Sequence, residues 1–294
     1  MEFISLGKTG LIVSRTAFGA LPIQRVSDRE EADRIIHRAY EGGINFFDTA
    51  RAYSDSEEKL GYAFHDIRKD VVIATKTTAS TPVALRRDLE TSLETLQTDY
   101  VDIYQVHNPS FVPFPGGADG LYDALIAEKR RGTIRHIGFT NHSADLARQA
   151  AASGFYDTVQ FPFSYLAAPE DTAVMETCRE HNVGFIAMKA LCGGLLTNAK
   201  ASFAWFRQYE SVIPIWGIQR MAELEEFLSM ENAPPELSAE ILHEIEADRE
   251  ALSGNFCRGC GYCLPCPQDI PINNANRMSQ LLRRSPQSNW LTPE

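Results

Sequence analysis

The feature that most constrains this chain is a repeated alternation of short apolar stretches with amphipathic ones. Eight apolar stretches, each typical of a buried strand, are each followed by a stretch with the apolar spacing of a helix. We predict strands at Thr16–Phe18, Ile44–Phe47, Val71–Thr75, Val101–Val106, Ile134–Phe139, Thr158–Phe161, Val183–Met188 and Val212–Ile215. The helices are predicted at Asp28–Glu41, Ser56–Phe64, Pro82–Leu96, Ala118–Arg131, Ser143–Ser153, Glu170–His181, Ala199–Tyr209 and Met221–Met230.

Strands that alternate with helices favour a parallel sheet with right-handed crossovers. Eight such units predict closure into a (β/α)8 barrel, an α/β fold that commonly needs about 250 residues. An open, doubly wound sheet is the alternative, and it would usually place a Gly-rich dinucleotide turn after the first strand. The residues Gly19–Pro22 at that point do not form such a turn, so we favour the barrel.

Two segments lie outside the eight units. Residues 1–15 hold two short apolar stretches around Gly7 and Gly10, which predicts a β-hairpin at the bottom of the barrel. After Met230 a Pro-containing linker, a polar helix at Ser238–Leu252 and a cysteine run follow. We therefore expect a barrel over residues 1–231 and a small cysteine-rich appendage over residues 232–294.

The charge balance excludes several functional classes. Lys and Arg number 28 against 39 Asp and Glu, a net charge of −11, whereas nucleic-acid and anionic-membrane binders need a basic face. The longest apolar runs fall far short of the ~18 residues of a membrane span. The first residues lack the basic and apolar regions of a secretory signal. We expect a cytoplasmic protein that binds neither nucleic acid nor membranes.

Four polar residues fall at the ends of three consecutive predicted strands. Asp48 ends the second strand, with Tyr53 five residues later; Lys76 ends the third strand and His107 the fourth. Taken singly, each residue has an ordinary structural interpretation. Asp48 would cap the next segment, the Tyr53 ring would be half-buried packing, the Lys76 ammonium would be solvated, and His107 would be a hydrogen-bonded loop residue. The carboxyl ends of barrel strands form one mouth, where active sites of this fold lie. We therefore expect the four side chains to meet there.

The residues around these four resemble the aldo-keto reductase family over roughly residues 1–230. The resemblance rests on several stretches in order, which are Leu6–Leu11, Gly43–Ala50 with Tyr53, Ser56-Glu57 and Leu60-Gly61, Ala74–Lys76, Val101–His107, Lys129–Thr133 and Ile137–Asn141. It implies reduction of a small carbonyl or sugar-like substrate, with hydride supplied by a nicotinamide cofactor.

The resemblance also assigns roles that suit the residue types. Tyr53 is the general acid, and Lys76 lowers the high pKa of the tyrosine. Asp48 keeps Lys76 charged and in place, while His107 orients the carbonyl oxygen.

The cofactor implied by the resemblance is NADPH, with NADH as the alternative. Asn141 and Gln160 match the residues that hold the nicotinamide carboxamide, and Ala190–Leu195 matches the pyrophosphate loop. The usual Lys-Ser stretch for the 2′-phosphate is missing, and Arg220 is the candidate replacement. The other residues at cofactor positions are Gly19, Ala20, Asp48, Met188, Lys189, Leu191, Gly193, Gly194, Gly217 and Gln219.

Four cysteines at two-residue gaps, followed by Pro267, are typical of a metal site. These are Cys257, Cys260, Cys263 and Cys266. The run resembles the ferredoxin-like tail of one subset of aldo-keto reductases and predicts a [4Fe-4S] cluster. Structural Zn²⁺ and thiols without metal are the alternatives. Cys266 is the favoured fourth ligand, with Cys192 and Cys178 as alternatives.

Three functions are therefore compared. An NAD(P)H-dependent carbonyl reductase is favoured, because a barrel that only binds dinucleotide would not need the tyrosine–lysine–aspartate set. The alternatives are an iron–sulfur electron-transfer protein with a redox partner, and a non-catalytic regulatory barrel. The sequence leaves the substrate and the oligomeric state open.

Overall fold

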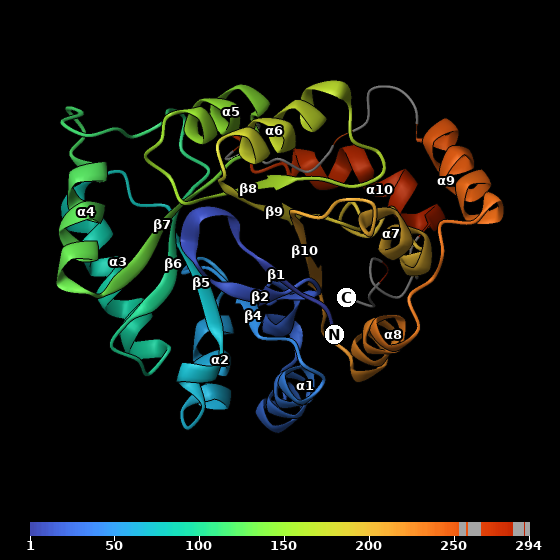
Figure 1. The fold of residues 1–294 in the computed structure, drawn as a ribbon, viewed down its shortest axis with the longest axis horizontal. Coiled ribbons are helices and arrows are strands. Elements are labelled where there is room, and N and C mark those ends of the chain that lie inside the picture. The colour runs from blue at the N-terminus through green and yellow to red at the C-terminus, as the bar shows by residue number, and fades with distance from the viewer. Residues whose placement is uncertain (253–256, 258–265, 285–290, 292–294) are drawn as a thin grey trace.

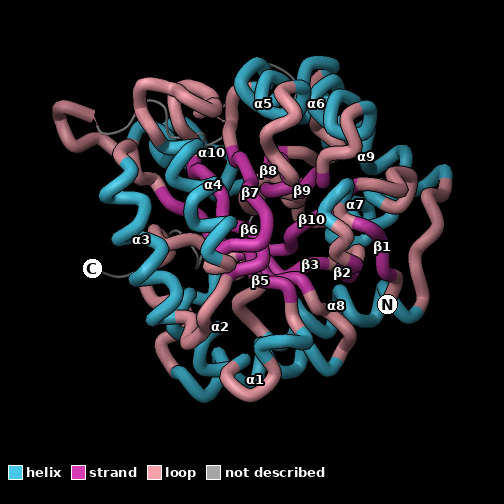
Figure 2. The backbone as a smooth tube through the Cα atoms, turned by 60° about the vertical axis from the view of Figure 1, so that its left-hand side comes forward, coloured by secondary structure: helices cyan, strands magenta, loops and turns pink. Residues whose placement is uncertain are grey.

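The computed structural model of this chain describes residues 1–252, 257, 266–284 and 291. Its centre is a closed barrel of eight parallel strands in the order β10-β3-β4-β5-β6-β7-β8-β9, with helices around the outside (Figures 1 and 2). The predicted (β/α)8 barrel is thus confirmed. Its strands are β3 (Ala17–Gly19), β4 (Phe46–Asp48), β5 (Val72–Thr77), β6 (Val101–His107), β7 (Ile134–Thr140), β8 (Thr158–Pro162), β9 (Gly184–Met188) and β10 (Val212–Gly217).

Helices follow the strands as the alternation predicted. They are α1 (Arg29–Glu41), α2 (Ser56–Phe64), α3 (Pro82–Thr95), α4 (Leu121–Arg131), α5 (Ala144–Ala152), α6 (Pro169–Glu180), α7 (Ala199–Phe206) and α8 (Met221–Asn232). Short 3-10 helices lie at Gly7–Thr9, Pro22–Arg25 and Arg68–Asp70. The two largest boundary errors are the end of α7, predicted at Tyr209, and the start of α4, predicted at Ala118. Gly120 has a left-handed φ of 66°, and the Asp119 carboxylate accepts a bond from the Leu121 N–H, so the helix starts only there.

The predicted N-terminal hairpin is also present. β1 (Phe3–Ser5) and β2 (Ile12–Ser14) pair in antiparallel fashion. Leu6 and Val13 are almost fully buried and pack with residues inside the barrel such as Phe46. The Lys8 N–H donates to the Asn182 carbonyl just before β9, at 2.8 Å. The hairpin therefore closes the barrel at the end opposite the carboxyl ends of the strands.

The chain continues beyond the barrel in two further helices, α9 (Ala239–Ala251) and α10 (Ile272–Arg284). The first was predicted, and the Ser238 hydroxyl caps it by accepting from the Ile241 N–H. The second was not predicted, because three asparagines in its first turns are poor helix formers. Its inner face is nevertheless anchored, since Leu281 is 1% exposed. Within the described residues, no helix is both long and apolar enough to cross a membrane.

Candidate active site

The barrel register brings the four predicted catalytic residues to one mouth. Asp48 ends β4, Lys76 lies near the end of β5 and His107 ends β6. Asp48 pairs with Ala74 across β4 and β5, and Lys76 pairs with Gln105 across β5 and β6. The carboxyl ends of these neighbouring parallel strands therefore lie side by side.

Lys76 and Asp48 form a buried ion pair. The Lys76 Nζ lies 2.6 Å from the Asp48 Oδ2 and also donates to the Thr49 carbonyl at 2.6 Å. The two side chains are only 1% and 2% exposed. Burial disfavours both charges, yet Asp48 and Tyr53 outweigh it at Lys76 and raise the lysine pKa. Lys76 therefore holds its proton at neutral pH.

Two glutamines complete the surroundings of Asp48. The Gln105 Nε2 donates to the Asp48 Oδ1 at 3.3 Å, and the Gln160 Nε2 donates to the Asp48 Oδ2 at 3.4 Å. Gln105 was not among the predicted site residues. It is fully buried in β6, the strand that ends at His107, and as a single amide it gave no distinctive sequence signal. Gln160 was predicted to hold a nicotinamide, and its Oε1 is buried without a hydrogen-bond partner among the described residues.

The ring of Tyr53 lies beside the Lys76–Asp48 ion pair. The Lys76 Nζ is 5.1 Å from the centre of its ring, and the His107 ring meets it edge-on with centroids 6.1 Å apart. Burial raises the pKa of Tyr53, while the Lys76 charge lowers it and Asp48 raises it again. The predicted lowering by Lys76 is thus present, but burial outweighs it and the net shift of the Tyr53 pKa is upward. Tyr53 is protonated at neutral pH and can donate a proton.

The loop that carries Tyr53 is fixed by hydrogen bonds at its base. The Tyr53 N–H donates to the Ala50 carbonyl at 3.0 Å, and the Arg51 N–H donates to the Lys76 carbonyl at 3.0 Å. The Arg51 guanidinium pairs with the buried carboxylate of Glu57 in α2. These contacts tie the tyrosine loop to β5, the strand of Lys76.

Two neutral histidines border the site. Burial, reinforced by the Lys76 charge, lowers the pKa of His107 to about 3. Its Nδ1 is buried without a partner in the part of the chain that the structure describes. Burial, Lys189 and His107 likewise lower the pKa of His142 to about 3. Sequence reasoning missed His142, although it directly follows Asn141 at the end of β7.

The predicted cofactor residues lie at the same end of the barrel. Gly19 and Gly217 are direct partners where β3 pairs with β10, and the neighbouring Ala20 N–H donates to the Asp48 carbonyl at 2.8 Å. Asn141 follows β7 and is fully buried. Its side chain bridges two loops, because Nδ2 donates to the Pro109 carbonyl and Oδ1 accepts from the Ser143 N–H.

The predicted pyrophosphate loop follows β9, which ends at Met188. Lys189, Cys192, Gly193 and Gly194 all have positive φ angles, from 52° to 92°. A Cβ added to Gly194 would meet no atom within 4 Å, so its backbone is open to a ligand. Leu191 closes the loop, since its carbonyl accepts from the N–H groups of residues 194 and 196.

Arg220 lies beyond the end of β10 and is engaged by a carboxylate. Its Nη2 lies 2.5 Å from the Glu223 Oε1, and its side chain is 58% exposed. The backbone N–H groups of Gln219 and Arg220 both donate to the other oxygen of Glu223. Glu223 thus occupies the Nε and Nη2 donors of Arg220, and a phosphate would compete with this carboxylate for them.

The predicted cysteine site is described only in part. Cys257 and Cys266 are half-buried, whereas Cys260 and Cys263 lie outside the described residues. Cys178 is fully buried in the core, where burial raises its thiol pKa to about 12, which disfavours it as a fourth ligand. Within the described ranges, no three His, Cys, Asp or Glu side chains are grouped to hold a metal ion.

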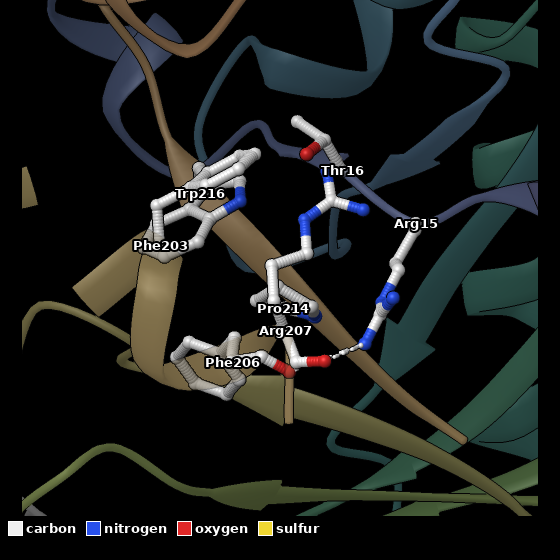
Figure 3. Close-up of a pocket in the computed structure, with 7 residues that line it drawn as sticks. All are labelled: Arg15, Thr16, Phe203, Phe206, Arg207, Pro214 and Trp216. Carbon is white, nitrogen blue, oxygen red and sulfur yellow. Dashed lines mark hydrogen bonds between the residues drawn. The ribbon is translucent and has the colours of Figure 1, made fainter. Parts of the chain in front are cut away.

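A small pocket near the start of β3 is unrelated to the mouth. Figure 3 shows the Arg15 guanidinium donating to the Arg207 carbonyl, at 2.9 Å, between β10 and α7. Arg15 and Thr16 come before β3, at the end that the hairpin closes. Arg207 and Thr16 share the buried Glu231 carboxylate. The Arg15, Thr16 and Arg207 side chains of this pocket are already held by other groups of the protein, so we assign the pocket to stability.

Comparisons with known proteins point to one enzyme family. The model of the Aldo/keto reductase family matches residues 17–208. The match ends before the run of four cysteines at residues 257–266. The chain is 32% identical to Aldo-keto reductase YhdN of Bacillus subtilis over 67% of this chain and 64% of that protein. It is 28% identical to the NADH-specific methylglyoxal reductase of Escherichia coli over 71% of this chain and 76% of that protein. The chain thus spans less than two thirds of the first relative.

Among solved structures, the aldo-keto reductase AKR11C1 from Bacillus halodurans superimposes with a TM-score of 0.73. It covers 84% of this chain and 96% of that one at 21% identity. At that identity the likeness establishes the fold alone.

Proposed function

The chain belongs to the aldo/keto reductase family, and we propose that it reduces small carbonyl compounds with a nicotinamide cofactor, with Tyr53 as the proton donor. One observation carries the proposal. A buried Lys76–Asp48 ion pair lies directly beside a half-buried, protonated tyrosine at the barrel mouth. Two charges are costly to bury. A barrel that only bound a dinucleotide would gain nothing from placing such a pair beside a tyrosine.

The described residues fit a nicotinamide cofactor. The Gln160 Oε1 is a buried acceptor without a partner among the described side chains and backbone, as a carboxamide NH2 would require. Gly194 offers backbone that a phosphate can approach. When bound, the cofactor supplies the hydride that reduces the carbonyl carbon. We propose that Asn141, Gln160 and Asp48 hold the nicotinamide end, and that Gly19, Ala20, Met188, Lys189, Leu191, Gly193, Gly194, Gly217, Gln219 and Arg220 line the rest.

The side chains of the mouth supply the proton and the orientation. Neutral His107 donates a hydrogen bond to the carbonyl oxygen and places it near the Tyr53 hydroxyl. Tyr53 gives its proton to that oxygen as the carbon is reduced, which yields an alcohol and a phenolate. The Lys76 ammonium stabilises the phenolate, Asp48 keeps Lys76 in place, and solvent returns the proton.

The direct test is cofactor binding followed by turnover. We expect NADPH and NADH to quench the intrinsic fluorescence of the purified chain with saturable curves, and NADPH to be oxidised in the presence of small aldehydes. The relative named as a methylglyoxal reductase makes methylglyoxal a suitable first probe. Lack of saturable binding by either cofactor would refute the proposal, whichever carbonyl compound is offered.

We propose in addition that Cys257, Cys260, Cys263 and Cys266 bind a [4Fe-4S] cluster in the appendage. The spacing supports this, and so does the placement of Cys257 and Cys266 between two anchored helices. Asp248 of α9 and Arg284 of α10 form an ion pair at 2.7 Å, so the two helices that flank the segment are joined to each other.

Anaerobically purified protein should contain about four irons and four sulfides per chain, and the Cys260→Ala variant should lose them. Zinc in place of iron would overturn the cluster and favour a structural zinc site. A Cys260→Ala variant with full iron content would exclude this cysteine as a ligand.

A further inference from the structure

Helix α10 lies against the loop that follows β9, the loop assigned above to the cofactor pyrophosphate. In Figure 1, α10 lies on the far side of the barrel from α1 and α2. Two arginines two turns apart on α10 contact this loop, and Leu281 between them is buried. The same helix face thus presents both charges and an apolar anchor to the loop.

The contacts are made to backbone carbonyls. The Arg277 Nη2 donates to the Cys192 carbonyl at 2.9 Å and to the Gly193 carbonyl at 3.2 Å. The Arg284 Nη1 donates to the Leu195 carbonyl at 3.2 Å. Charged donors to carbonyls make stronger bonds than neutral ones. The two arginines therefore hold three carbonyls within a four-residue stretch of the loop.

The loop has a backbone that needs such support. Lys189 and Cys192 have left-handed φ angles of 57° and 52°, which side chains disfavour and which persist only when the surroundings hold them. Gly193 packs closely against the helix, because an added Cβ would lie 2.9 Å from the Arg277 Nη2. The loop conformation and the position of Arg277 are therefore matched to each other.

Helix α10 is itself fixed through α9. Asp248 in α9 pairs with Arg284 at 2.7 Å and accepts a bond from the Tyr165 hydroxyl, in the loop after β8, at 2.5 Å. The Arg249 Nε donates to the Tyr165 carbonyl at 2.8 Å. The two helices beyond the barrel therefore tie together the loops that follow β8 and β9.

We propose that Arg277 and Arg284 are positioning residues that hold the β9 loop in the conformation that binds the cofactor pyrophosphate. This rests on the proposed nicotinamide-dependent function. Neither arginine touches the reacting atoms in this scheme. The helices beyond the barrel thereby set cofactor affinity and the rate of cofactor release, and leave the chemistry at Tyr53 unchanged.

The test compares Arg277→Ala and Arg277→Lys with a matched control, Arg283→Ala. Arg283 lies on the same helix, is exposed and has no contact with the loop among those observed. NADPH dissociation constants and dissociation rates are measured by fluorescence, and kcat at saturating cofactor with an aldehyde. Melting temperatures of all variants are recorded in parallel.

Arg277→Ala should raise the dissociation constant of NADPH about tenfold or more, the effect of losing charged hydrogen bonds, with a matching rise in dissociation rate. Arg277→Lys should fall between it and the parent, while Arg283→Ala should bind NADPH like the parent. kcat should stay within about twofold throughout.

Two results would overturn the inference. One is a parent that binds NADPH and an Arg277→Ala variant with the same affinity. The other is an equal loss of affinity in Arg277→Ala and Arg283→Ala. Lack of binding by the parent would instead refute the proposed function itself.

Discussion

Replacing Lys76 by Met leaves the Asp48 carboxylate buried at the barrel mouth without its cation. In the parent, Asp48 is 2% exposed and its Oδ2 lies 2.6 Å from the Lys76 Nζ. Met fills a similar volume, so the change removes a charge and creates little empty space. We expect both lower stability and a new dependence of stability on pH.

The expected cost follows from what remains around Asp48. Removing one partner of a buried ion pair typically destabilises a protein by about 3–5 kcal/mol, because the other charge is left uncompensated. Two glutamine amides remain, at 3.3 and 3.4 Å, and each continues to stabilise the carboxylate. We therefore predict a loss near the lower end, about 3 kcal/mol, at pH 7.

The sign of the pH dependence follows from the pKa of Asp48 in the variant. Burial raises this pKa, and the lysine that opposed the rise is gone. The folded variant therefore binds a proton more tightly than the unfolded chain, whose aspartates have pKa values of ~3.9. Its stability falls as the pH rises from the unfolded pKa through the folded one. The loss relative to the parent should be smaller at pH 5 than at pH 8.

Urea unfolding at several pH values between 5 and 8 measures this directly. The matched control is the Asp48→Asn, Lys76→Met double variant, which buries no charge at this point. It should be more stable than Lys76→Met at pH 8 and should lack the added pH dependence. A Lys76→Met variant whose loss of stability is the same at pH 5 and pH 8 would refute the buried-charge reasoning.

Three further predictions concern binding and turnover. Arg220→Ala should weaken NADPH binding about tenfold, since one contact between an arginine and the 2′-phosphate is worth ~1.5–3 kcal/mol. NADH binding should stay unchanged, and equal effects on the two cofactors in a titration would exclude Arg220 as the discriminating residue. His107→Ala should lower kcat and raise KM for the carbonyl substrate, and steady-state kinetics that show a change in KM alone would restrict His107 to binding. Because the His107 pKa is about 3, kcat/KM of the parent should show no inflection from this histidine between pH 5 and 8. An inflection that disappears in His107→Gln would contradict that pKa.

The barrel could be predicted from the sequence because its signal is repeated eight times. Each buried strand is short, apolar and followed by an amphipathic helix, so errors at single boundaries do not change the topology. Helix α10 gave no such signal. Its asparagine-rich start disfavours a helix, and contacts with the β9 loop through Arg277 and Arg284 anchor it instead.

The candidate site could be predicted only as far as strand ends reveal it. Asp48, Lys76 and His107 fall at such ends, and the fold brings them together. Gln105 and His142 were missed because a single amide in a strand, or a histidine in a loop, has no distinctive spacing. The lowering of the Tyr53 pKa by Lys76 was predicted, but the net upward shift was not. The charge of Lys76 can be read from the sequence, whereas the opposing burial of the tyrosine depends on the folded structure.

The most direct test of the account is the Tyr53→Phe variant, which removes one hydroxyl and leaves the ring in place. We predict that kcat for aldehyde reduction falls by about 10²-fold or more, the usual contribution of general acid catalysis. The dissociation constant of NADPH, measured on the same preparation, should stay within about twofold of the parent value. A variant that binds NADPH normally and retains kcat within about threefold of the parent would contradict the assignment of Tyr53 as the proton donor.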